Sequence, residues 1–200
     1  MKLKTDNLFF DAMGTLGDFI LLNIIFVITC IPVVTIGMAQ AALYAELSKM
    51  AKGEYAHVVS EYLALCKREW KKATKLWIPM LLIGAVLVFD VLYAGNVSHV
   101  IDICVGAMLF FWILIFSYAF PLTSHFENTV SGTVKNAFYM AVRHFPYTVA
   151  IVILNMIPVV FFLFAPGLFG LLVPIYMVAG FVLCARINTV MFQKIFKQYE

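Results

Sequence analysis

The chain contains few charged residues. Only 12% of its 200 residues are Asp, Glu, Lys or Arg, whereas 64% are apolar. Soluble domains carry about 25% charged and 45–50% apolar residues, and a water-soluble fold of this size needs more polar surface than this composition supplies. The net charge of +3 is also too small to attract a polyanion. These deficits exclude a soluble domain, a disordered chain and a nucleic-acid-binding module.

Paired cysteines and enzyme motifs are absent as well. The four cysteines are dispersed without a C-x-x-C pair, and the four histidines form no H-E-x-x-H motif. The chain has no G-x-S-x-G, no phosphate-binding G-x-x-x-x-G-K-[ST] and no G-x-G-x-x-G. We therefore expect no disulfide framework, no metal site and no cofactor, and we expect that the protein is not an enzyme.

The sequence contains several long apolar stretches. A helix needs about 20 mostly apolar residues to cross a bilayer, and five stretches reach that length. Their apolar runs are continuous and do not alternate, so they predict helices rather than barrel strands. The expected fold is all-α, a polytopic transmembrane bundle forming one domain over residues 1–200. The predicted spans are 16–40, 76–95, 100–120, 147–164 and 168–192.

Basic residues are distributed unevenly among the connecting segments. Seven Lys and Arg residues lie in segment 46–75, whereas the connections 96–99 and 165–167 contain none. Segment 125–146 and the C-terminal tail contain two each. Basic loops stay on the cytoplasmic side. We therefore expect a multi-pass protein of the plasma (inner) membrane with its long loops and C-terminus in the cytoplasm.

The side on which the N-terminus lies is open. Five spans place Met1 outside, although Lys2 and Lys4 favour the cytoplasm. Alternatively, residues 16–50 form a hairpin or re-entrant segment that is broken at Pro32, because proline removes a backbone donor. The five-span arrangement is the main prediction, and the broken hairpin is its alternative.

Both longer cytoplasmic segments show helical amphipathicity. Apolar residues recur at spacings of three and four in segments 58–75 and 131–145, which predicts one helix in each. Each helix could lie on anionic lipid headgroups or could dock a cytoplasmic partner, and lipid contact is the commoner case. The basic residues on the first helix are Lys67, Arg68, Lys71, Lys72 and Lys75.

Four polar residues within the spans are candidates for function, since ionisable or amide side chains are costly in lipid. Asn23 and Asn155 lie deepest and are expected to bond across helices. Asp90 lies near the outer surface. Arg186 lies near the cytoplasmic end of the last span, where Glu46 or Glu127 could pair with it or where it could snorkel to the headgroups.

The order span, amphipathic helix, span occurs twice, in residues 16–95 and again in residues 100–164. Some transporters consist of parallel repeats of this kind. Because residue identity between the two units is low, the repeat is a hypothesis about topology alone.

Several short blocks of sequence resemble the YesL family of bacterial membrane proteins. The blocks are Ile31-Pro32-Val33-Val34-Thr35-Ile36-Gly37, Phe120-Pro121-Leu122, Phe126-Glu127-Asn128-Thr129, Lys135-Asn136-Ala137 and His144-Phe145-Pro146-Tyr147-Thr148. The chain departs from the family at His125, where members commonly have a basic residue. The motif positions are Pro32, Thr35, Gly37, Pro121, Asn128, Lys135, Asn136 and Pro146.

The resemblance implies a polytopic protein whose relatives are often encoded beside carbohydrate uptake systems, and it supplies no catalytic residues. We expect a non-enzymatic accessory component of an oligosaccharide ABC importer, in contact with the bilayer and with importer subunits. The alternative is a small-solute permease. Convergence of Asn23, Asp90, Asn155 and Arg186 on one cavity would favour transport, and dispersal would favour scaffolding. The oligomeric state is left open.

Overall fold

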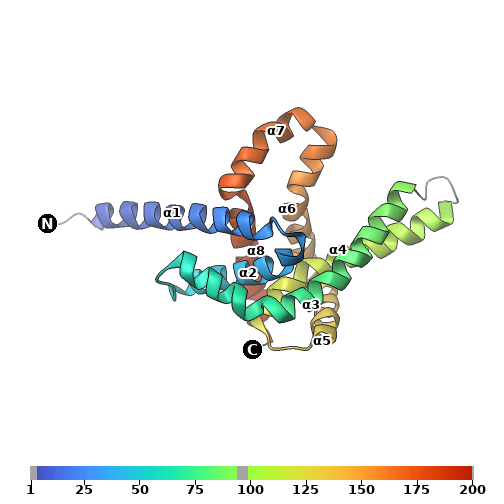
Figure 1. Cartoon of the computed structure of the whole chain (residues 1–200), viewed down its shortest axis with the longest axis horizontal. Coiled ribbons are helices and arrows are strands. Elements are labelled where there is room, and N and C mark those ends of the chain that lie inside the picture. Colours follow the sequence, from blue (N-terminus) through green and yellow to red (C-terminus); the bar gives the residue numbers. More distant parts are fainter. Residues whose placement is uncertain (1–3, 94–98, 200) are drawn as a thin grey trace.

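The computed structural model describes residues 4–93 and 99–199, which are almost entirely helical and contain no strand within these two ranges. The predicted all-α class is confirmed. The end of the predicted second span, residues 94 and 95, and the connection 96–98 lie outside the described residues. The helices are α1 (Lys4–Cys30), α2 (Ile36–Lys52), α3 (Val58–Tyr93), α4 (His99–His125), α5 (Val130–Arg143), α6 (Phe145–Phe164), α7 (Pro166–Ile175) and α8 (Phe181–Phe196) (Figure 1).

The centre of the fold is α2, which contacts α1, α3, α4 and α8. Residues 37–39 and 41–47 of this helix are all buried. Small residues at a helix surface let neighbouring backbones approach closely, and α2 presents four buried alanines: Ala39, Ala41, Ala42 and Ala45. The helix ends at Gly53, whose φ of 72° is left-handed and costs glycine little.

Among the described residues, five helices are long and apolar enough to cross a membrane. This count agrees with the five predicted spans, although the boundaries differ. The candidate spans are Met13–Cys30, Val58–Tyr93, His99–His125, Phe145–Phe164 and Val173–Phe196. The central helix α2 is not one of them.

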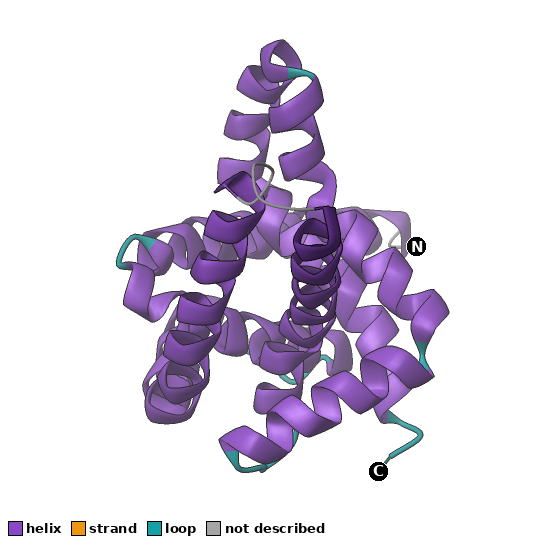
Figure 2. Ribbon diagram, turned by 90° about the vertical axis from the view of Figure 1, so that its right-hand side faces the viewer, coloured by secondary structure: helices purple, strands orange, loops and turns teal. Residues whose placement is uncertain are grey.

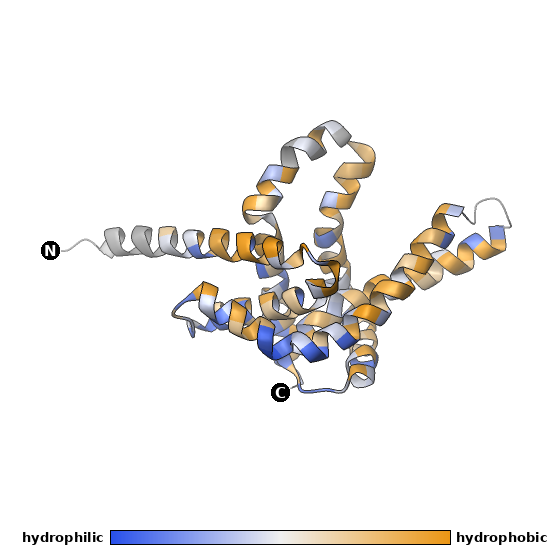
Figure 3. Cartoon of the chain, viewed as in Figure 1, coloured by the Kyte–Doolittle hydropathy of each residue, from blue (hydrophilic) through white to orange (hydrophobic). Residues whose placement is uncertain are grey.

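Three arms extend from the centre (Figure 1). They are α1, the outer parts of α3 and α4, and the α6–α7 pair, which also stands apart in the turned view (Figure 2). Leu92 and Ile103 on the α3–α4 arm are each 73% exposed. Hydrophilic residues instead gather around the first half of α3 and the α2–α3 loop (Figure 3). Exposed apolar area on this scale marks a surface that water does not cover.

The predicted first span, 16–40, is wrong as a single helix. The helix α1 ends at Cys30, and a 3₁₀ turn at Val33–Thr35 (η1) precedes α2, which runs back beneath α1 (Figure 1). The physical cause is Pro32, which has no N–H to donate to the preceding turn and which disfavours helical geometry in the residue before it. The alternative with a break at Pro32 therefore describes the backbone correctly.

One other predicted boundary is also wrong. The amphipathic helix 58–75 and the span 76–95 are one continuous helix, α3, because Pro79 is accommodated inside it. The predicted fifth span, 168–192, lies in a stretch that is helical from Pro166 to Phe196, through α7, a π-helical segment at Tyr176–Gly180 (η3) and α8, and the candidate span there is Val173–Phe196. Likewise, α5 and α6 match the predicted helices 131–145 and 147–164 closely.

The two units of the hypothesised repeat differ in their elements. The first unit contains the buried helix α2 between its first and last helices, whereas only the loop after His125 separates α4 from α5. Pro32 interrupts the first unit, but Pro121 lies inside α4. The order of elements expected for a repeat is therefore not present.

Candidate functional site

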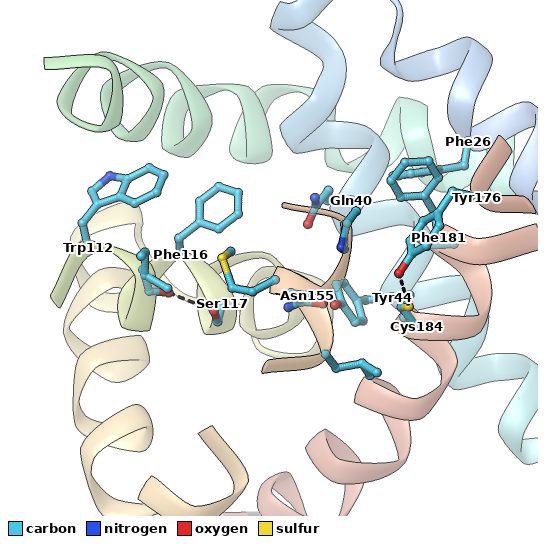
Figure 4. Close-up of a pocket in the computed structure, with 16 residues that line it drawn as sticks. Phe26, Gln40, Tyr44, Trp112, Phe116, Ser117, Asn155, Tyr176, Phe181 and Cys184 are labelled. Carbon is cyan, nitrogen blue, oxygen red and sulfur yellow. Dashed lines mark hydrogen bonds between the residues drawn. The ribbon is translucent and has the colours of Figure 1, made fainter. Parts of the chain in front are cut away.

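A cavity of about 260 Å³ lies among α1, α2, α4, α6 and the end of the chain that contains η3 and α8 (Figure 4). Trp112 and Phe116 stand on one side of it, and a second group of rings stands opposite. The lining residues from the described chain include no Asp, Glu, Lys, Arg or His. The second group of rings is Phe26, Tyr176 and Phe181, and the polar side chains between the two groups are Gln40, Tyr44, Ser117 and Asn155.

Asn155 is held by a second, fully buried asparagine, Asn188 of α8. The Asn188 Nδ2 donates to Asn155 Oδ1 at 2.9 Å and approaches the Tyr44 hydroxyl at 3.5 Å. The Asn188 Oδ1 has no partner within the described residues. Burial raises the pKa of Tyr44 to about 12, against the smaller lowering effect of the Asn188 hydrogen bond. The cavity wall formed by Tyr44 and Asn155 is therefore polar and neutral.

Asn23 joins α1 to the π-helical segment η3. Its Nδ2 donates to the carbonyl oxygens of Tyr176 at 3.1 Å and Met177 at 2.8 Å, and its Oδ1 accepts from the Val182 N–H at 3.0 Å. A π-helical turn displaces the regular hydrogen bonds of a helix, so the amide supplies partners that the helix does not. Gly180 has room for no side chain, because a Cβ would lie 2.7 Å from Tyr176 Cγ. Asn23 thus fixes the segment that carries Tyr176 to the cavity.

The other two predicted polar residues lie elsewhere. Asp90 is partly buried in the α3–α4 arm and does not line the cavity. The Arg186 Nη1 donates to the Leu47 carbonyl oxygen at 3.3 Å. Of the alternatives for Arg186, an ion pair with Glu46 or Glu127 is not formed within the described residues, and the backbone of α2 supplies an acceptor instead. Of the four predicted residues, Asn155 lines the cavity and the others are dispersed.

Glu46, which the sequence suggested only as a partner for Arg186, is a buried ionisable residue. Its side chain has no exposed surface, and neither carboxyl oxygen has a hydrogen-bond partner within the described residues. Burial, and then the nearby Glu61 carboxylate, raise the pKa of Glu46 from 4.5 to about 7, against the lowering effect of Lys49. The central helix therefore carries a carboxyl group that is partly protonated at neutral pH.

The first motif block forms the turn between α1 and α2. Thr35 Oγ1 donates to the Pro32 carbonyl at 2.6 Å, which closes the turn. Trp77 Nε1 of α3 donates to the Val33 carbonyl at 2.7 Å. A Cβ on Gly37 would lie 2.4 Å from Trp77 Cβ, so only glycine permits this contact. The block therefore acts as a structural joint between α2 and α3.

The second group of motifs surrounds the end of α4. Pro121 is buried inside this helix. Lys72 reaches across from α3, and its Nζ donates to the carbonyls of Thr123 at 3.3 Å and Phe126 at 2.9 Å, where α4 leaves orphan acceptors. Asn128 lies partly buried in the following loop. These contacts give Lys72 a structural role within the predicted basic set.

The last motifs divide into exposed and buried parts. Lys135 and Asn136 are exposed on α5, and Pro146 lies in the first turn of α6, where its missing N–H costs nothing. Thr148 is fully buried and shares a 2.8 Å hydrogen bond with the buried Tyr118 hydroxyl. This pair connects α6 to α4.

The remaining basic residues of α3 form an exposed stripe. Lys67, Lys71 and Lys75 repeat every four residues, are exposed, and form no ion pair within the described chain. Arg68 pairs with its neighbour Glu69 at 2.8 Å. An open hollow of about 640 Å³ lies beside the stripe, between Arg68, Glu69 and Lys72 of α3 and residues 123–129.

Most residues that form the cavity were not predicted from the sequence. Gln40 and Tyr44 lie four residues apart, at the end of the predicted first span and just after it. Their spacing places them on one helix face, which was the available signal once the break at Pro32 was recognised. Trp112, Phe116 and Ser117 were hidden in the apolar run of the third span and gave no signal.

Comparison with known proteins gave one match. A family model described as a protein of unknown function, DUF624, matches residues 19–91, from the middle of α1 to the outer part of α3. No curated protein and no solved structure matches the chain. The family match covers the joint at Pro32, the central helix and the basic stripe.

Proposed function

We propose that this chain is a plasma-membrane protein that acts as a non-enzymatic accessory component of an oligosaccharide ABC importer. The support is its resemblance to YesL proteins, which are members of the matched DUF624 family, and whose genes often neighbour carbohydrate uptake systems. The two charged candidates, Asp90 and Arg186, do not line the cavity, which supports a scaffolding role over a charged transport pathway.

The observation that carries the proposal is the basic stripe on α3. Lys67, Lys71 and Lys75 stand free of ion pairs in the described chain, and Trp70 beside them is 44% exposed. Exposed tryptophan is enriched at the centres of protein interfaces, and unpaired basic side chains around it steer the approach of an acidic partner. The stripe lies in the hydrophilic region of the molecule (Figure 3), so a partner would approach it from water. Such a partner would present an acidic surface.

The orientation of the protein is part of the proposal. Because the basic residues concentrate on the α2–α3 side and around α5, we place both in the cytoplasm, together with the C-terminus. The ATPase subunits of an importer act on that side of the membrane, so the stripe would be accessible to them.

A charge-reversal experiment tests the accessory role. The variant K67E/K71E/K75E is expected to lose co-purification with importer subunits and to reduce oligosaccharide uptake in cells. The matched control is K52E/K194E/K197E, which makes the same charge change at exposed positions at the end of α2 and near the C-terminus. Equal uptake and equal co-purification by wild type and both variants would overturn the proposal.

A small-solute permease is the second candidate, and the neutral cavity is the observation that favours it. Purified protein in liposomes without importer subunits would then support solute flux. Flux that the K67E/K71E/K75E variant retains would favour the permease, and uptake that requires the importer would favour the accessory role.

A further inference from the structure

We infer that the cavity beside Asn155 is a binding site for one small, uncharged, hydroxylated ring compound of about the size of a monosaccharide. The inference concerns binding alone, and it holds whether the protein assists an importer or transports a solute itself. It depends on the unpaired polar groups of the cavity, on its aromatic walls and on its lack of charge.

The cavity presents polar groups that the protein leaves without partners. The Gln40 amide makes no hydrogen bond with any described residue, and Asn155 uses only its oxygen, for Asn188. Ser117 Oγ donates to the Ile113 carbonyl at 2.8 Å, so its lone pairs remain open to a donor. Gln40 and Asn155 are half-buried and open onto the cavity, so a bound molecule with both donors and acceptors would pair with their free amide groups.

The aromatic walls define the shape of the occupant. Trp112 and Phe116 face the cavity from α4, and Tyr176 and Phe181 face it from the opposite side (Figure 4). A ligand between two such groups needs apolar faces, whereas its edge must meet Gln40 and Asn155. Hydroxyl groups both donate and accept hydrogen bonds, and the faces of a saturated ring carry C–H groups. A hydroxylated ring meets both requirements.

The size of the cavity and its lack of charge further restrict the class of ligand. At about 30 Å³ per water molecule, the 260 Å³ cavity holds roughly nine waters, which is about the space of one six-membered ring with its hydroxyl groups. Because no Asp, Glu, Lys, Arg or His from the described chain lines the cavity, an ionised ligand would lose its hydration without gaining a counter-charge. Charged analogues of the same ring should therefore be rejected.

The test uses the full-length protein in lipid nanodiscs, with D-glucose and D-galactose as probes. Binding is measured by tryptophan fluorescence, since Trp112 lines the cavity, and by the shift in melting temperature. At least one of the two neutral sugars is expected to bind and to raise the melting temperature. Glucuronate and glucosamine carry a charge, and cyclohexanol lacks most of the hydroxyl groups. All three are therefore expected to bind at least about tenfold more weakly than the neutral sugars.

The variant Gln40→Leu makes the test specific. Gln40 forms no hydrogen bond within the described chain, so the Gln40→Leu variant without ligand should melt at or above the wild-type temperature. Its affinity for the sugar should fall about tenfold, which corresponds to the loss of one hydrogen bond. Asn155→Leu should also lose binding, and Asn136→Leu on the exposed face of α5 is the matched control. The inference is overturned if neither sugar binds, if charged analogues bind equally, or if Gln40→Leu binds like wild type. Retention of a lipid that excludes both sugars would overturn it as well.

Discussion

Individual amide and hydroxyl side chains hold the apolar helices of this protein together at specific points. Asn23 bonds to η3, Asn188 bonds to Asn155, and Thr148 bonds to Tyr118, so each pair joins two different helices. Apolar surfaces alone give little preference for one packing over another in lipid, because lipid tails are as apolar as the side chains. These bonds therefore select one arrangement of the bundle.

Replacement of Asn23 by leucine should destabilise the protein by roughly 1–3 kcal/mol. The variant leaves the carbonyls of Tyr176 and Met177 and the N–H of Val182 without the partners they have now. Thermal unfolding in detergent, followed by circular dichroism, measures the change. Asn136→Leu, at an exposed position on α5, should have little effect, and a similar loss in both variants would contradict the role of Asn23.

Glu46 should make the stability of the protein depend on pH. The pKa of its carboxyl is raised by burial from 4.5 to about 7, so the unfolded chain releases this proton at lower pH than the folded chain does. The contribution of Glu46 to the free energy of unfolding is therefore constant below about pH 4.5, decreases between about pH 4.5 and 7, and stays low above that.

The variant Glu46→Gln should remove this decrease and stabilise the protein above pH 7 by roughly 1–3 kcal/mol. Unfolding measured from pH 5 to 8 checks the prediction. Glu54→Gln is the control, because Glu54 is exposed in the α2–α3 loop. A wild type and a Glu46→Gln variant with parallel pH profiles would show that the buried carboxyl has a partner in solution.

At the scale of helices, prolines and glycines decide where segments break and how closely they pack. Pro32 ends α1, whereas Pro79, Pro121 and Pro158 lie inside continuous helices. A helix ends just before Pro32 and not at the other prolines because the residues after Pro32 form a 3₁₀ turn. Hydrogen bonds from Thr35 and Trp77 stabilise this turn. Proline alone therefore does not predict a helix end.

Gly37→Ala should destabilise the joint between α2 and α3 by roughly 1–3 kcal/mol, the usual range for overpacking. The added Cβ would lie 2.4 Å from Trp77 Cβ and would push the two helices apart. The melting temperature and the fluorescence of Trp77 report the change. Gly106→Ala in α4 is the control, since nothing lies within 4 Å of a Cβ there, and it should be neutral or slightly stabilising. Equal behaviour of the two variants would show that the close contact does not exist.

The helices themselves were largely predictable, because apolar length and amphipathic spacing depend on local sequence. The ranges 131–145 and 147–164 agree with α5 and α6 to within two residues at each boundary. Two predictions were wrong: that residues 16–40 form one helix, and that 58–75 and 76–95 are separate helices. Both depend on whether neighbouring helices stabilise a break in the chain. Of the cavity, only Asn155 was predicted, since its other polar residues look ordinary in an apolar run.

At the scale of the whole molecule, the fold separates a polar region from apolar helices, above all the outer parts of α3 and α4 (Figure 3). Side chains such as Leu92, Ile103 and Phe164 are more than 70% exposed. A water-exposed surface of this kind would aggregate, so lipid is the medium that suits it. The first half of α3 and α5 lie outside these apolar parts and are available to water or headgroups.

Cysteine labelling should find the polar region on one side of the membrane. In a background without the native cysteines, Lys67→Cys and Lys135→Cys are expected to react only from the cytoplasm, and His99→Cys only from outside. All three positions are exposed, so poor reactivity cannot be due to burial. Labelling of Lys67→Cys from the outer face would reverse the proposed topology.

Composition and hydropathy were sufficient to assign an all-helical membrane protein with five candidate spans, because transfer into lipid depends on the summed apolarity of each segment and not on its neighbours. Only the tertiary structure revealed that α2 lies buried at the centre, that Asn23 holds a π-helical turn, and that Gln40, Tyr44 and Asn155 face one neutral cavity. These features depend on contacts between helices that are distant in the chain. Local sequence carries no record of which helix faces meet.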